Sequence, residues 1–159
     1  MKGNIYLVLH NIRSLHNVGS IFRTADAAGV SKIYLTGYTP SPKDVFGNYR
    51  KEISKIALGA EKYIEWEKVR YIEPLIKRLK KEHVQIIALE QARVAIDYRK
   101  FKPRFPLALI LGNEVRGLSP SILKKCDKVI QIPMQGRKES LNVSVAAGIA
   151  LFSIANKNN

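Results

Sequence analysis

Short apolar segments alternate with helical patterns along the whole chain, and this alternation restricts the possible folds more than any other feature. The apolar segments end at turn residues, as buried strands do. We expect strands at 5–9, 32–35, 63–67, 84–89, 106–111 and 128–132. We expect helices at 17–28, 49–57, 72–81, 119–125 and 141–156. The sequence therefore predicts an α/β fold, with a mostly parallel sheet and helices on both of its faces.

Local signals set several boundaries of these elements. Ser119 followed by Pro120 is a typical helix start, and Gly29 is a typical helix end. Segments 37–48 and 91–104 are rich in turn residues or charges and are expected to be loops. Since no repeat or linker interrupts the pattern, we expect a single domain over residues 1–159.

The chain is strongly basic, with 27 Lys and Arg against 13 Asp and Glu and a net charge of +14. A surface of this charge attracts polyanions, because binding releases their condensed counterions. Nucleic acid is therefore the leading partner, although a generally basic proteome is an alternative explanation.

Other bulk features exclude whole classes of protein. Cys126 is the only cysteine, so an intrachain disulfide is impossible and a cysteine zinc site is disfavoured. The histidines, His10, His16 and His83, lack metal-ligand spacing, and we expect no metal. The longest apolar segment, 141–155, is too short to span a membrane, and the N-terminus resembles a strand more than a signal peptide. We therefore expect a cytoplasmic protein.

Three polar segments are the candidates for chemistry. The first contains Asn17 and Arg23, which are six residues apart and so lie on different faces of a helix unless Asn17 precedes its first turn. The second, after the strand at 106–111, contains Gly112, Glu114 and Arg116. In open α/β sheets, ligands bind where such strands end.

The third polar segment follows the last strand and leads into the last helix. It contains Arg137 and Lys138 in a basic loop, then Ser140 and Asn142, either of which could cap the helix. A helix start of this kind can bind a carboxylate or a phosphate.

Each segment also has a purely structural explanation. Asn17 could be a helix cap, Arg23 a solvated charge, and Glu114 and Arg116 could pair with each other or cap neighbouring helices. No GxGxxG sequence follows the first strand, no Walker A sequence is present, and Ser140 lacks a nucleophile-elbow context. Dinucleotide-binding, phosphate-loop NTPase and serine-hydrolase chemistry are therefore disfavoured.

Together and in this order, the three segments resemble the three motifs of the SPOUT superfamily, in particular its SpoU (TrmH-like) branch of RNA ribose 2′-O-methyltransferases. NVGSIFRTADAAGV (17–30) resembles the first motif, LILGNEVRGLS (109–119) the second, and IQIPMQGRKESLNVSVAAGIALF (130–152) the third. The resemblance implies a C-terminal trefoil knot that forms an S-adenosylmethionine pocket. It also implies a homodimer whose active site is completed across the interface.

The resemblance further assigns roles to individual residues. Seven residues would line or adjoin the cofactor pocket: Leu89, Leu111, Gly112, Ile132, Met134, Ser140 and Leu141. Arg23 would contact the ribose and its phosphate and stabilise developing alkoxide charge, because a guanidinium is a poor base. Asn17 would orient Arg23 or the ribose, and Glu114, Ser140 and Asn142 would organise the pocket.

We expect tRNA or rRNA as the substrate, bound without a separate RNA-binding domain. The candidate RNA contacts are Arg13, Arg23, Arg116, Arg137 and Lys138, with the basic helix at 72–81 and the 99–104 loop as further possibilities. Two alternative functions are open at this point: a non-catalytic RNA-binding module with the same fold, and a SPOUT enzyme that methylates a base.

Overall fold

A seven-stranded parallel sheet forms the centre of the computed structural model, which describes residues 2–159. The strands lie in the order β3-β2-β1-β6-β4-β7-β5, so the first three strands occupy one half and the later ones the other. The strands are β1 (Ile5–His10), β2 (Lys32–Thr36), β3 (Glu65–Val69), β4 (Gln85–Leu89), β5 (Ile96–Asp97), β6 (Leu107–Leu111) and β7 (Lys128–Gln131). The prediction of a mostly parallel sheet is confirmed.

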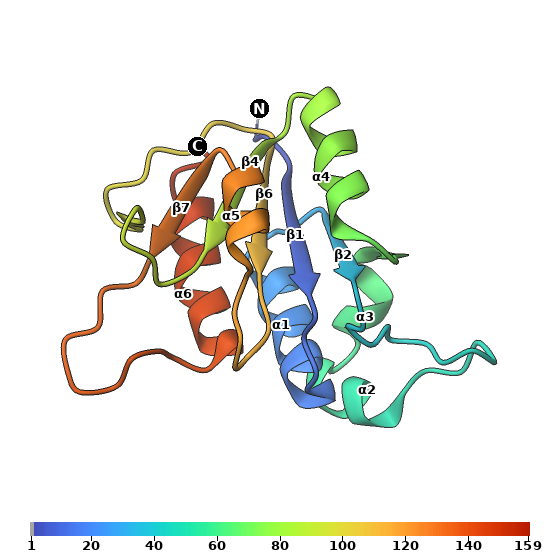
Figure 1. Cartoon of the computed structure of the whole chain (residues 1–159). Helices are drawn as coiled ribbons and strands as arrows, with labels where there is room; N and C mark the ends of the chain where they lie inside the picture. The colour runs from blue at the N-terminus through green and yellow to red at the C-terminus, as the bar shows by residue number, and fades with distance from the viewer. Residues whose placement is uncertain (1) are drawn as a thin grey trace.

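Helices cover both faces of this sheet, as expected (Figure 1). One face packs against α1 (Leu15–Ala27) and α6 (Val143–Ala155), which contact each other, and against the short α2 (Lys51–Ala57) and α3 (Ala60–Tyr63). The other face packs against α4 (Ile72–Lys81) and α5 (Pro120–Lys125). No helix among residues 2–159 is long and apolar enough to cross a membrane.

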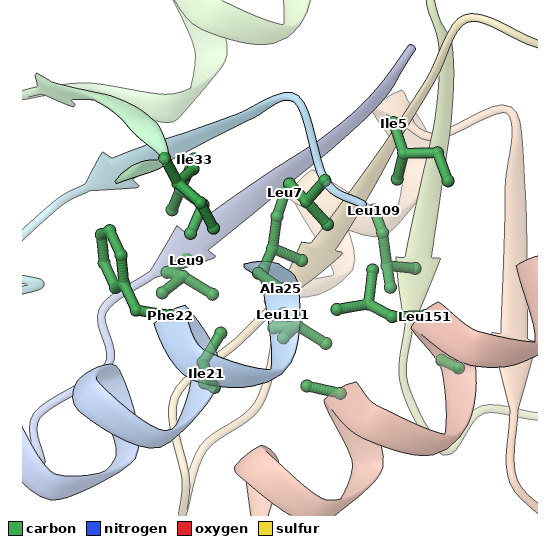
Figure 2. Close-up of a cluster of buried hydrophobic side chains, with 14 of the residues drawn as sticks. Ile5, Leu7, Leu9, Ile21, Phe22, Ala25, Ile33, Leu109, Leu111 and Leu151 are labelled. Carbon is green, nitrogen blue, oxygen red and sulfur yellow. The ribbon is translucent and has the colours of Figure 1, made fainter. Parts of the chain in front are cut away.

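Alternating side chains of the central strands separate the core into two clusters. Leu7, Leu9 and Leu109 point to the α1 and α6 face, where Figure 2 shows them beside Phe22 and Leu151. Their neighbours on the same strands, such as Val8 and Ile110, belong to the cluster under α4 and α5. A strand with apolar residues on both faces is buried on both faces, which explains the continuous apolar run of β6.

Four expectations about local structure need correction. Helix α1 begins two residues before Asn17, because the Ser14 hydroxyl accepts a hydrogen bond from the Asn17 N–H and caps the helix. The helix expected at 49–57 begins at Lys51, and a second short helix, α3, follows it after Leu58 and Gly59, both of which have positive φ. Tyr63 therefore ends a helix and does not begin β3. The expected loop at 91–104 contains the two-residue strand β5, which pairs with β7.

The parallel strands all end at one edge of the sheet, at the bottom of Figure 1, and the polar segments follow them there. The loops after β6 and β4 and the long 132–142 loop after β7 therefore meet at this edge. The trefoil knot stays a prediction from the family resemblance.

Candidate functional site

A cavity of about 140 Å³, open to solvent, lies at the carboxyl ends of β4, β6 and β7. Leu89, Leu111, Gly112, Ile132, Met134, Ser140 and Leu141 all line it, so the structure brings together the seven residues assigned to a cofactor pocket. Their role in binding stays a prediction, but their convergence from three separate segments is a property of the fold.

The charge of the cavity lining contrasts with that of the whole protein. Glu90 and Glu114 contribute carboxylates, and none of the described residues that line the cavity is a lysine or arginine. In a chain of net charge +14, this arrangement disfavours a phosphate-bearing ligand. It suits a ligand that carries positive charge beside apolar groups.

Three side chains from distant segments form one directed chain of hydrogen bonds beside the cavity. Asn142 Nδ2 donates to Asn17 Oδ1 over 3.2 Å, and Asn17 Nδ2 donates to Glu114 Oε1 over 3.2 Å. Asn142 Oδ1 accepts from the Ser144 N–H at 2.9 Å and caps α6. Because each side chain in this network has a defined donor and acceptor, the network holds the loop after β6 against the starts of α1 and α6.

Glu114 lies at the amino-terminal end of α1. Its carboxylate accepts hydrogen bonds from the backbone N–H groups of Arg13 and Ser14, each at 3.1 Å. Partial burial raises the pKa of Glu114, but these donors and Asn17 outweigh that effect and leave the pKa below its ordinary value. Glu114 is therefore ionised at neutral pH, and the positive end of the helix dipole favours that charge.

Asn113 shapes the loop that carries Glu114 and Arg116. Its Oδ1 accepts from the N–H groups of Val115 and Arg116, at 2.9 and 2.8 Å, and closes a tight turn. Gly117 has a φ of +64° at the end of this turn, a conformation that favours glycine. A Cβ at Gly112 would lie only 2.7 Å from the Gly117 carbonyl carbon, so the two glycines allow the loop to fold back on itself.

Several structural alternatives can now be decided. Glu114 does not pair with Arg116 in the described structure but caps α1, so the capping alternative holds for this carboxylate. Asn17 is not a helix cap; it is buried within the first turn of α1. Its hydrogen bonds go to Glu114 and Asn142, and none connects it to Arg23 of the same chain among the described residues.

The predicted RNA-contacting residues lie outside the cavity. Arg23 is exposed on α1, and Arg13 precedes that helix. Arg116 is exposed on the loop after β6, while Arg137 and Lys138 lie on the exposed 132–142 loop. All five side chains are accessible to a large ligand, but Arg23 does not line the cavity of its own chain.

Sequence reasoning missed several residues of the cavity. Glu90 accepts hydrogen bonds from the N–H groups of Leu118 and Gln91, at 2.9 and 3.0 Å, and Gln91 Nε2 donates to the Ile132 carbonyl at 2.7 Å. These two side chains connect the ends of β4, β6 and β7. Polar residues directly after a buried strand predict a site in the loop after β6, and Glu90 and Gln91 follow β4 in the same way.

Comparison with known proteins gives one consistent family. Residues 4–152 match the model of the SpoU rRNA Methylase family. YacO, a TrmH family protein of Bacillus subtilis, is 32% identical over 154 residues, which are 97% of this chain and 59% of YacO. This chain thus spans about three-fifths of the length of the first relatives it matches.

Solved structures agree with the sequence comparison. The S-adenosylmethionine-bound rRNA methyltransferase of Sinorhizobium meliloti has a TM-score of 0.86 and 33% identity, over 98% of this chain and 57% of that one. The TrmH/SpoU tRNA modifying enzyme of A. aeolicus has a TM-score of 0.84 and 31% identity, over 98% of this chain and 76% of that one.

Proposed function

The chain belongs to the SpoU rRNA Methylase family, and on that premise we propose that it transfers a methyl group from S-adenosylmethionine to a ribose 2′-hydroxyl of tRNA or rRNA. The observation that carries this proposal is the cavity itself. It gathers residues of the second and third motifs into one lining, and the first motif joins it through Asn17. Because tRNA and rRNA are the proposed substrates, we place the activity in the cytoplasm.

The lining fits this cofactor. Leu89, Ile132 and Leu141 offer apolar surface for a purine, and Ser140 offers a hydroxyl. The carboxylates of Glu90 and Glu114 supply the negative field that a sulfonium cation requires, in a cavity whose described lining has no basic side chain. When bound, S-adenosylmethionine supplies a methyl group that is already electrophilic, so the remaining task of the protein is alignment.

The residues of this chain would divide that task between them. The Arg23 guanidinium contacts the ribose and its phosphate and stabilises the charge that develops on the 2′-oxygen. Arg13, Arg116, Arg137 and Lys138 bind the RNA backbone around the cavity, so this one domain supplies its own RNA-binding surface. Asn17 and Asn142 hold the two helix starts against the loop that carries Glu114.

We also propose a homodimer in which Arg23 of one protomer serves the cavity of its partner. Helix α6 is apolar apart from Ser144 and Ser153, although only one side packs on the sheet, and Val145 and Phe152 remain 51% and 44% exposed. A second copy would cover these side chains. Arg23 does not line the cavity of the chain that carries it, which is consistent with an active site completed across the dimer interface.

The decisive experiment is transfer of labelled methyl from S-adenosylmethionine to total tRNA and, separately, to rRNA, followed by nucleoside analysis. We expect a ribose-methylated nucleoside in one of the two pools. Arg23→Ala should lose methyl transfer by about 10²-fold or more, the usual effect of removing one transition-state donor, while cofactor affinity measured by calorimetry stays unchanged. Normal transfer by Arg23→Ala would overturn its assignment.

The other outcomes separate the alternative functions. Cofactor and RNA binding without turnover would favour the non-catalytic RNA-binding module, and a methylated base would favour a SPOUT base methyltransferase. Subunit mixing tests the shared site: Arg23→Ala mixed with a cofactor-deficient Gly112→Ala should regain part of the activity that each lacks alone. No recovery in a mixture that contains heterodimers would show that each protomer uses its own Arg23.

A further inference from the structure

The segment between β2 and α2, residues 37–50, projects from the body of the protein on the right of Figure 1. We call it the arm. An antiparallel bridge joins Lys43 to Tyr49, and the Asp44 N–H donates to the Asn48 carbonyl at 2.8 Å. Asp44 Oδ1 accepts from the N–H groups of Phe46 and Asn48, at 2.9 and 3.0 Å. The tip is therefore a preformed turn.

The tip of the arm exposes apolar and aromatic side chains. Val45 and Phe46 are 91% and 84% exposed, and their turn holds them away from the core. A flexible loop could fold such side chains against the protein surface, but this hydrogen-bonded turn keeps them in solvent. An aromatic side chain presented on a preformed turn can bind a flat ligand with little loss of backbone conformational entropy.

Two lysine ammonium groups lie against one tyrosine ring of the arm, Tyr49, and have no acidic partner among the described residues. Lys43 Nζ and Lys62 Nζ lie 5.0 and 5.1 Å from the centre of the Tyr49 ring, and neither forms an ion pair with the residues that the structure describes. The nearest carboxylate along the arm, Asp44, is occupied by the two N–H groups of the turn. Two cations beside the same ring, neither of them paired with a carboxylate among the described residues, favour binding of an anion.

The base of the arm is connected to the candidate active site. Asn113 Nδ2 donates to the Tyr38 hydroxyl at 2.9 Å, and Asn113 is in the loop that lines the cavity. Lys68 Nζ donates to the Gly37 carbonyl at 2.7 Å and anchors the same end from β3. The arm thus begins at the cavity loop and extends outward from the sheet edge where the cavity lies.

We propose that the arm binds an unpaired segment of the RNA substrate, with a base stacked on Phe46 and backbone phosphates at Lys43 and Lys62. The inference rests on the proposed function and adds the part of the substrate that is recognised. Aromatic rings bind unpaired bases by stacking, whereas a duplex keeps its bases stacked on each other. The enzyme should therefore prefer a target nucleotide that has a single-stranded neighbour.

The test compares a fluorescein-labelled unpaired 12-nucleotide RNA with a duplex of the same sequence, using the full chain. Phe46→Ala should weaken binding of the unpaired RNA about 5- to 100-fold and leave duplex binding within about 2-fold. Phe46→Trp should restore the affinity, because tryptophan also stacks. The double variant Lys43→Ala/Lys62→Ala should reduce the salt dependence of unpaired RNA binding by a slope of about 1.4, that is, two phosphates at ~0.7 each.

Val94→Ala is the matched control, since Val94 is also an exposed apolar residue on a loop but lies outside both the arm and the cavity lining. It should change neither affinity. Equal loss on unpaired and duplex RNA, or no loss with Phe46→Ala, would overturn the proposal. So would a change from dimer to monomer in Phe46→Ala measured by light scattering, which would assign the tip to a second copy of the chain. If the unaltered protein neither binds RNA nor transfers methyl, the proposed function itself fails.

Discussion

Replacement of Glu114 by glutamine tests how the cavity loop is held. Glu114→Gln keeps the shape of the side chain and one acceptor oxygen, but it removes the charge from the start of α1. Hydrogen bonds to a charged group contribute about 1.5–3 kcal/mol and neutral ones about 1 kcal/mol. The Arg13, Ser14 and Asn17 donors share one carboxylate that is only partly buried, so their separate contributions do not add. With the helix-dipole contribution of ~0.3–1 kcal/mol, we expect a loss of about 1–2 kcal/mol in the free energy of unfolding at pH 7.

The pH dependence of the unfolding free energy shows whether the charge of Glu114 causes the loss of stability. The pKa of Glu114 is lowered on folding, so its contribution is complete above the ordinary carboxyl value of 4.5 and is lost as the pH falls through the folded value. Urea unfolding followed by circular dichroism at several pH values measures this difference. The curves of the two proteins should be separated at pH 7 and approach each other below pH 4.5. Glu139→Gln is the control, because Glu139 is exposed and makes no side-chain hydrogen bond or ion pair with the described residues.

Two results would refute this reasoning. If Glu114→Gln is as stable as the unaltered protein at pH 7, the capping bonds contribute nothing measurable. If its deficit is the same at pH 7 and at pH 3, the loss comes from packing or geometry and not from the carboxylate charge.

Two further predictions concern the cavity loop and the core. Gly112→Ala should weaken S-adenosylmethionine binding at least about tenfold in calorimetry, since a Cβ there lies 2.7 Å from the Gly117 backbone and the loop must move. Binding at full affinity would show that the loop can shift without consequence. Leu109→Ala, in the fully buried centre of β6, should lower the free energy of unfolding by about 2–5 kcal/mol in urea titration. A loss below about 1 kcal/mol would contradict the central position of β6.

The sequence predicted the elements whose signals are local. The apolar run of β6 and the Ser119–Pro120 start of α5 both lie where expected. The missed features depend on contacts between distant segments. β5 is two residues long and exists only because it pairs with β7, and the order of the strands has no signal in any single segment. Helix α1 starts before Asn17 because the Asn17 amide, a good cap by composition, bonds to Glu114 and Asn142 instead, and Ser14 caps the helix.

The same hydrogen bonds determine whether Glu114 can act as a general base. A general base needs a lone pair directed at the reacting hydroxyl and a pKa near the working pH. The Glu114 oxygens accept from two backbone N–H groups and one amide, and its pKa is lowered by them, so the carboxylate is a poor proton acceptor at neutral pH. Its position joins the cavity loop to the first turn of α1, the helix that carries Arg23. We therefore expect Glu114 to act as a positioning residue, so that its removal disturbs the cavity and the placement of Arg23 together.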